Sequence, residues 1–152
     1  MDKLAKLVTD IGKLWANYSS AYFTGIQNTL ILAVAATLVG CLIGLLCGVL
    51  NTIPFTQNDH PAKRFFLKLL RGLIRIYVEV FRGTPMVLQA VFIFYGLPYF
   101  TDGAVAFKGM AGIWTAALIV VSINTGAYMA ESVRGGIISI DPGQTEGAKA
   151  IG

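Results

Sequence analysis

Few side chains in this 152-residue sequence could take part in covalent chemistry. The single histidine, His60, lies in the polar stretch 57–61, which has the composition of a turn. The two cysteines, Cys41 and Cys47, lie in one apolar run and are expected to be buried thiols, because the chain lacks further metal ligands and one helix has the wrong geometry for a disulfide. There is no Ser/His/Asp arrangement and no phosphate-cradling Gly-x-x-x-x-Gly-Lys-Ser/Thr segment. The sequence therefore predicts no catalytic residue, no metal site and no bound cofactor.

Two pairs of opposite charge stand at the borders of long apolar segments. Glu79 and Arg82 precede one segment, and Glu131 and Arg134 follow another. Side chains three residues apart can meet on one helix, so each pair can form by itself. The simpler interpretation is that the pairs neutralise charge at a membrane surface. The functional interpretation is a cytoplasmic gate, in which Arg82 exchanges its partner for Glu131 as the gate opens and closes.

A few polar side chains lie deeper in the apolar segments. A polar group in hydrocarbon is costly without a partner, so these side chains must face other helices or a cavity. Hydrogen bonding between helices is one interpretation. The other is a translocation path, for which Asn124 and Tyr128, one helical turn apart, and Gln89 are the candidates.

The composition predicts a membrane protein. Of the residues, 55% are apolar and 13% are charged. A soluble domain of this length buries only ~70% of its unfolded surface and could not hide so much apolar side chain. The net charge of +4 is modest, and the basic residues lie mainly beside the apolar runs, where they can reach lipid headgroups. Membrane lipid is therefore an expected partner, and nucleic acid is not.

Three uncharged segments are long enough to cross a membrane as helices. They predict an all-α polytopic membrane protein with spans near residues 28–50, 84–101 and 110–132, within a transmembrane domain of residues 25–134. Residues 1–24 carry apolar side chains at helical spacing with lysines on other faces, which predicts an interfacial amphipathic segment.

Proline and glycine residues are expected to set the ends of these spans. Thr84 predicts an N-cap for the second span, with Pro85 at its first helical position. The Gly-Leu-Pro sequence at residues 96–98 is expected to end or kink this span. The charges that follow the third span and the Gly-Gly pair at residues 135–136 are expected to close it.

Small residues recur at every fourth position of the first span. They are Ala36, Gly40, Gly44 and Gly48. Residues four apart lie on one face of a helix, and small side chains let another helix backbone come close in lipid. The stripe therefore predicts helix packing.

Basic residues are concentrated between the first and second spans, where only Asp59 and Glu79 oppose them. They are Lys63, Arg64, Lys68, Arg71, Arg75 and Arg82. Short loops rich in lysine and arginine resist translocation, so this connection is expected on the cytoplasmic side. The amino terminus is then outside and residue 152 cytoplasmic, although three lysines near the amino terminus count against this orientation.

Three stretches in the second half carry a family resemblance. They are Tyr-Val-Glu-Val-Phe-Arg-Gly-Thr-Pro at residues 77–85, Gly-Ala-Tyr-Met-Ala-Glu-Ser-Val-Arg-Gly-Gly at residues 126–136, and Gln-Thr-Glu-Gly-Ala-Lys-Ala-Ile-Gly at residues 144–152. In order and spacing they resemble permease subunits of bacterial ABC importers for histidine, glutamine, arginine, glutamate and opines. The resemblance implies the type I ABC importer transmembrane fold, incomplete here, because the chain is expected to be a fragment that stops after the start of the cytoplasmic EAA loop.

In the resembling family, the EAA loop forms a short helix that docks into the ATPase subunit. Residues 135–152 look like the start of this coupling loop, after a turn at residues 141–143. Glu146, Ala148 and Gly152 keep the family pattern, whereas Gly147 departs from it at a helix-propensity cost of ~1 kcal/mol. The resemblance thus assigns these four residues to ATPase coupling.

The resemblance also implies partners in the bacterial cytoplasmic membrane. These are an ABC ATPase subunit that binds ATP, an extracytoplasmic solute-binding protein and a second permease subunit, identical or similar. The implied function is uptake of a polar amino acid, with no enzymatic activity in this chain. An ATP-independent secondary transporter or channel is the alternative, but such carriers usually place an ionisable residue near the midplane, whereas every carboxylate here lies at or outside a span end. A structural membrane anchor is a third class.

Overall fold

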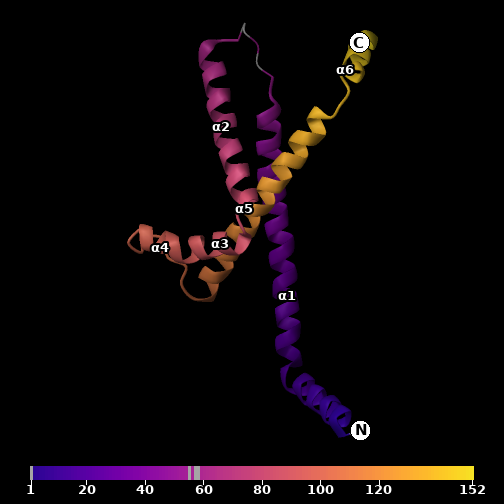
Figure 1. Ribbon diagram of the computed structural model, residues 1–152, viewed down its shortest axis with the longest axis vertical. Coiled ribbons are helices and arrows are strands. Elements are labelled where there is room, and N and C mark those ends of the chain that lie inside the picture. The colour runs from indigo at the N-terminus through magenta and orange to yellow at the C-terminus, as the bar shows by residue number, and fades with distance from the viewer. Residues whose placement is uncertain (1, 55, 57–58) are drawn as a thin grey trace. The chain divides into compact units, whose positions relative to one another are not determined.

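The computed structural model describes residues 2–54, 56 and 59–152, and these residues are helical with short connections (Figure 1). The elements are α1 (Asp2–Thr52), α2 (Pro61–Gly83), α3 (Met86–Val91), the π-helix η1 (Phe92–Gly96), α4 (Leu97–Phe100), α5 (Gly109–Ile138) and α6 (Pro142–Ile151). The predicted all-α class is confirmed. The chain divides into two compact units, Met1–Val34 and Ala35–Gly152, and α1 contributes to both.

The first unit is the beginning of α1. Its apolar side chains are exposed, and the Trp15 ring stacks on Tyr22 at 6.3 Å and meets Phe23 edge-on at 6.0 Å. Threonine hydroxyls at positions 9, 24 and 29 each donate to the carbonyl four residues earlier. No proline interrupts this stretch. Helix α1 therefore continues through residue 25, where the sequence predicted a boundary between an interfacial segment and a span.

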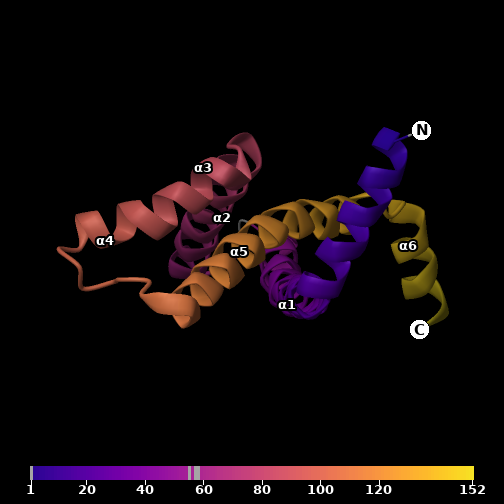
Figure 2. The same cartoon turned by 90° about the horizontal axis from the view of Figure 1, so that it is seen from below.

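The second unit is held together by α5, which packs against α2 and the second half of α1 (Figures 1 and 2). Ile74 and Val78 of α2 form a small buried cluster with Ala130 of α5. The stripe of small residues on α1 lies against α5: a Cβ atom at Gly40 would come within 2.7 Å of the Thr125 Cβ. Ala36 of the same stripe is fully buried. The two helix backbones can approach closely only because this stripe carries almost no side chain.

Helices α2 and α3 are separated by a bend of 110°. Thr84 and Pro85 are extended, and Pro85 is the residue that precedes the first turn of α3. The predicted cap at this point is wrong by one residue: Thr84 does not cap α3, and its hydroxyl donates to the Val80 carbonyl at 2.8 Å. The physical reason is that a residue before proline is driven out of the α-helical region, so Thr84 ends α2.

The segment from α3 to α4 continues helically through residues 96–98. Gly96 closes the π-helix η1, and Pro98 lies in the first turn of α4. Pro98 has no N–H to donate to the preceding turn, and the wider turn of a π-helix accommodates this. The end or kink expected at residues 96–98 therefore takes the form of a π-helix.

The candidate membrane spans follow from helix length and apolar composition. Within the described residues, α1 and α5 each meet both requirements. The expected second span, residues 84–101, meets them only when α2 is counted with it as one bent pair.

Helix α5 also runs further than predicted. It passes through Gly135 and Gly136 to Ile138, and the Ser139 N–H closes its last turn on the Gly135 carbonyl at 3.0 Å. Two glycines cost a helix only ~1 kcal/mol each, which is too little to end a helix of this length. The next helix, α6, begins at Pro142 and is capped by Asp141, whose carboxylate accepts from the Gly143 N–H at 2.7 Å.

The start of α2, like that of α6, is capped by a side chain. Residues 57 and 58 of the predicted turn lie outside the described residues. His60 precedes α2 and accepts from the Ala62 N–H at 3.3 Å. A hydrogen bond from the Lys63 ammonium and one from the Thr56 N–H hold the pKa of Asp59 below its usual value.

Because α1 and α5 approach closely, one methyl group added between them should lower the stability of the protein. Gly44→Ala places a Cβ against the Met129 Cβ, 2.8 Å from the Gly126 carbonyl oxygen and 2.9 Å from the Ala130 nitrogen. We expect a loss of about 1–3 kcal/mol in unfolding free energy, measured by thermal unfolding in detergent. Gly72→Ala on α2 is the matched control, because its Cβ meets nothing within 4 Å, and it should be neutral or slightly stabilising. Equal stability of the two variants would mean that the helices are not in contact.

Candidate functional site

A network of amide hydrogen bonds holds the bend between α2 and α3. Gln89 of α3 is buried, with 7% of its surface exposed. Its Nε2 donates to the Phe81 carbonyl at 2.9 Å, to the Thr84 carbonyl at 3.0 Å and to the Thr84 hydroxyl at 2.9 Å. The last carbonyls of a helix have no partner within the helix, so a side chain from the next helix supplies one here.

Asn124 of α5 joins the same network. Its Nδ2 donates to the Gln89 Oε1 at 3.1 Å and to the Phe81 carbonyl at 3.2 Å. Their amide groups join three helices, as the interpretation of hydrogen bonding between helices expects, and their assignment to the translocation path stays a prediction. The hydrogen bonds account for the burial of Gln89 without a substrate.

A second polar contact ties α2 to α5, and sequence reasoning missed it. The Tyr77 hydroxyl donates to the Ile123 carbonyl at 2.6 Å. Space for the phenol comes from Gly126, where a Cβ would lie 2.7 Å from the Tyr77 oxygen. The available signal was a tyrosine on an apolar face of an amphipathic helix, since a buried phenol needs an acceptor.

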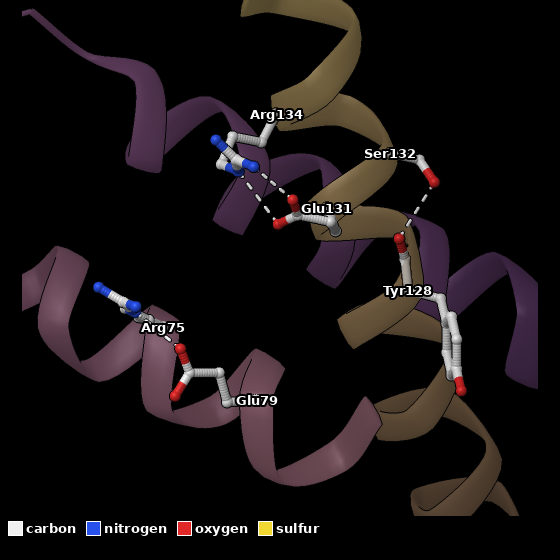
Figure 3. A network of polar contacts seen from close by, with 6 residues as sticks. All are labelled: Arg75, Glu79, Tyr128, Glu131, Ser132 and Arg134. Atoms are coloured by element: carbon white, nitrogen blue, oxygen red, sulfur yellow. Dashed lines mark hydrogen bonds and ion pairs between the residues drawn. The ribbon is translucent and has the colours of Figure 1, made fainter. Parts of the chain in front are cut away.

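The charged residues at the predicted gate form a rim around a cavity between α2 and α5. Figure 3 shows Glu79, Glu131 and Arg134 of this rim. Glu131 and Arg134 of α5 pair through two hydrogen bonds, one of them 3.0 Å long between Arg134 Nε and Glu131 Oε2. The predicted pair of Glu79 with Arg82 does not form. Glu79 accepts instead from Arg75 Nε at 2.7 Å, because an arginine four residues earlier is equally within reach on a helix.

Arg82 has a different neighbour. Its guanidinium carbon lies 5.4 Å from the centre of the Tyr128 ring of α5, within the range of a cation–π contact. Tyr128 is half-exposed, with 50% of its surface accessible, and its carbonyl accepts from the Ser132 hydroxyl at 3.1 Å (Figure 3). Of the three candidates for the translocation path, Tyr128 alone has an exposed side chain. Its ring is in contact with Arg82, one of the gate candidates.

The cavity inside this rim has a volume of about 660 Å³. Six charged residues line it: Arg71, Arg75, Glu79, Arg82, Glu131 and Arg134. All four gate candidates therefore face one space between α2 and α5. Arg82 and Glu131 also interact electrostatically across it.

The predicted coupling residues lie on α6 or directly after it. Glu146, Gly147 and Ala148 are in the helix, and Gly152 follows it with a φ of +104°. Every residue of α6 is exposed, so the helix contributes no side chain to the core of this unit. These residues and the charged rim are joined by α5 and a connection of three residues, 139–141.

Residues 40–152 match the model of a protein family described as the binding-protein-dependent transport system inner membrane component. The chain belongs to this family. The matched range includes the small-residue stripe from Gly40 onward, the amide junction, the charged rim and α6.

Similar proteins of this family transport amino acids or opines, according to their names. The chain is 35% identical over 129 residues to the glutamine transport system permease protein GlnP of Escherichia coli K12, covering 84% of this chain and 51% of GlnP. It is 33% identical over 141 residues to the octopine permease OccM of Rhizobium radiobacter (91% and 52% covered), and 33% identical over 131 residues to the arginine permease ArtQ of Bacillus subtilis (84% and 50% covered). The chain thus spans about half the length of these relatives.

A solved structure shows the same fold. The crystal structure of an amino acid ABC transporter with histidines superposes with a TM-score of 0.71 and 30% sequence identity, covering 90% of this chain and 55% of that chain. The predicted resemblance to amino acid ABC permeases is therefore confirmed at the level of family and fold.

The amide junction predicts a strong effect of one substitution. Gln89→Leu keeps the approximate size of the side chain but removes the donor to the Phe81 and Thr84 carbonyls and the acceptor for Asn124. We expect a loss of about 2 kcal/mol or more in unfolding free energy, because buried polar partners are left unsatisfied. Thermal unfolding in detergent measures it, with the exposed Gln27→Leu as the control. Asn124→Leu added to Gln89→Leu should cost less than the sum of the single changes, and strict additivity would contradict the network.

Proposed function

We propose that this chain is part of the permease subunit of an ATP-driven importer that moves a polar amino acid across the bacterial cytoplasmic membrane. The match of residues 40–152 to the family of binding-protein-dependent inner membrane components carries this proposal. Relatives named as permeases for glutamine, octopine and arginine support the class of substrate. The partners follow from the same class: an ABC ATPase subunit that binds the ATP, an extracytoplasmic solute-binding protein, and a second permease subunit.

The orientation proposed is amino terminus outside and residue 152 cytoplasmic. The basic residues of α2 support it, since short connections rich in arginine and lysine stay on the cytoplasmic side. Figure 1 places α6 at the same end of the second unit as the start of α2. This orientation puts the exposed α6 where an ATPase subunit can reach it.

Helix α6 is proposed to dock into the ATPase subunit through Glu146, Gly147, Ala148 and Gly152. Its exposed surface and its small residues allow a groove to close around it, and a cap at Asp141 fixes its beginning. Glu146 adds a negative charge that a basic groove can bind. The helix is therefore suited to carry a force from a partner to α5.

The charged rim is proposed to act as the cytoplasmic gate. Arg82 lies over the Tyr128 ring and also interacts electrostatically with Glu131, whose carboxylate Arg134 holds. A shift of α5 against α2 would let Arg82 exchange the ring for the carboxylate. Such an exchange gives two discrete arrangements of one set of charges, which a two-state element requires.

Substitutions at the end of α6 test the coupling role. Gly152→Arg adds bulk at a left-handed position, and Glu146→Lys reverses a charge, both on an exposed surface outside the spans. We expect both variants to reach normal levels in the membrane but to recover at least tenfold less ATPase subunit on the affinity-tagged permease and to lose uptake of radiolabelled amino acid.

Two controls separate the causes of such a loss. Thr56→Arg adds the same side chain to the connection between α1 and α2 and should leave docking intact. Gly152→Ala tests backbone strain without bulk and should give an intermediate effect. Normal ATPase recovery and uptake in both Gly152→Arg and Glu146→Lys would mean that α6 is a solvated connector and not a coupling helix. Uptake without any bound ATPase would favour a secondary transporter.

Thiol labelling tests the orientation. In a background with Cys41 and Cys47 replaced by serine, Thr56→Cys should resist a membrane-impermeant thiol reagent in intact cells, whereas Ala104→Cys should react. Both positions are exposed, so accessibility of the side chain itself is matched. Lysed cells should label both. The reverse pattern in intact cells would place α6 outside and remove it from any cytoplasmic partner.

A further inference from the structure

Five of the six basic residues of α2 lie on one face of the helix, and Lys63 lies off it. They recur at intervals of four, three, four and seven residues: Arg64, Lys68, Arg71, Arg75 and Arg82. At 1.5 Å per residue this face is ~27 Å long. Arginine and lysine side chains in such a row cannot face hydrocarbon along its length, so the face needs water or an anionic partner.

The cavity between α2 and α5 carries more positive than negative charge. Its lining includes four arginines and two glutamates. Both glutamates are already paired, Glu79 with Arg75 and Glu131 with Arg134. Arg71 donates to the carbonyl of Ile53. In the described part of the chain, Arg82 makes no hydrogen bond or ion pair: it lies over the Tyr128 ring and interacts with Glu131 only electrostatically.

The cavity lies at the ends of two candidate spans. Asn51 near the end of α1 and Ile138 at the end of α5 both line it. The end of a span is the level of the lipid headgroups. Val78 and Ile138 give the cavity an apolar part beside the charges, and a volume of about 660 Å³ lies within the usual range for a bound small molecule.

We propose that this cavity binds the phosphate group of an anionic phospholipid, with Arg82 as the principal ligand. A guanidinium presents a planar fork of N–H donors that matches phosphate oxygens, and the unpaired fork of Arg82 is available for it. Figure 3 shows the carboxylates of Glu79 and Glu131 held by their own arginines, which keeps them from repelling the phosphate. The acyl chains leave the cavity past the exposed Ile138 into the surrounding lipid.

A lipid fits these features better than a free phosphate. A free phosphate would gain from the arginines but not from the apolar wall, whereas a lipid uses both. Basic pockets between membrane helices at the headgroup level recognise anionic lipids in this way. The cavity is the one lined by the gate candidates, but lipid binding does not require that Arg82 also exchange partners as a gate.

Native mass spectrometry of the purified membrane protein tests the proposal with phosphatidylglycerol as the probe and phosphatidylcholine of the same acyl chains as the reference. We expect the unmodified protein to prefer phosphatidylglycerol. Arg82→Gln should weaken phosphatidylglycerol binding about fivefold and leave phosphatidylcholine unchanged, since one basic residue near the surface contributes ~1 kcal/mol to an anionic lipid. Arg82→Lys keeps the positive charge but removes the planar set of guanidinium donors, so it should weaken phosphatidylglycerol binding less than Arg82→Gln does.

Arg64→Gln is the matched control, because it removes the same charge from the same face of α2 outside the cavity. Equal losses in Arg64→Gln and Arg82→Gln would reduce the effect to general surface charge and overturn the site. Displacement of the lipid by millimolar inorganic phosphate would show that a free anion, not a lipid, is the ligand. If Arg82→Gln does not elute as a folded species, the unmodified protein still decides: no preference for phosphatidylglycerol over phosphatidylcholine overturns the proposal.

Discussion

The break between α2 and α3 depends on hydrogen bonds that come from outside α2. In a bilayer, a helix that stops leaves carbonyl groups that water cannot satisfy. Here Gln89 and Asn124 donate to the Phe81 carbonyl, at 2.9 and 3.2 Å. The same bonds fix the position of α5 against α2, since Asn124 belongs to α5. Arg82 follows Phe81 directly, and Tyr128 lies one turn after Asn124, so the contact between this cation and this ring is a consequence of the junction.

A second constraint is the space at Gly126, where three helices of the second unit meet. A Cβ there would lie 2.7 Å from the Tyr77 oxygen and 3.0 Å from the Ile43 Cγ2. Close packing of α1 on α5 and the hydrogen bond from Tyr77 to Ile123 thus require the same missing side chain. In lipid, where apolar burial between helices contributes little, contacts of this kind supply the association energy.

Local spacing predicted the elements better than it predicted their partners. The small-residue stripe indicated a close-packed face of α1, but nothing in its spacing identified α5 as the neighbour. The i, i+3 rule holds for Glu131 with Arg134 and fails for Glu79, because Arg75 competes for that carboxylate and Arg82 finds Tyr128 on another helix. Gln89 and Asn124 were ambiguous for the same reason: a polar residue in a span needs a partner, and only the tertiary fold says whether that partner is protein or cargo. The roles of Glu146 and Gly152 stay predictions, since an exposed helix shows a surface and not its partner.

The arrangement along α5 links the proposed coupling helix to the proposed gate. Asn124, Tyr128, Glu131 and Arg134 lie on one uninterrupted helix, and α6 follows its end. Arg134 is ten residues, or ~15 Å, from Asn124 along the axis. If α6 is displaced by a partner while the Asn124 amide holds the Phe81 carbonyl, α5 must pivot near Asn124, and the displacement grows with distance from this pivot. Tyr128 and Glu131 then move past Arg82 by different amounts, which is the relative motion that an exchange of partners by Arg82 needs.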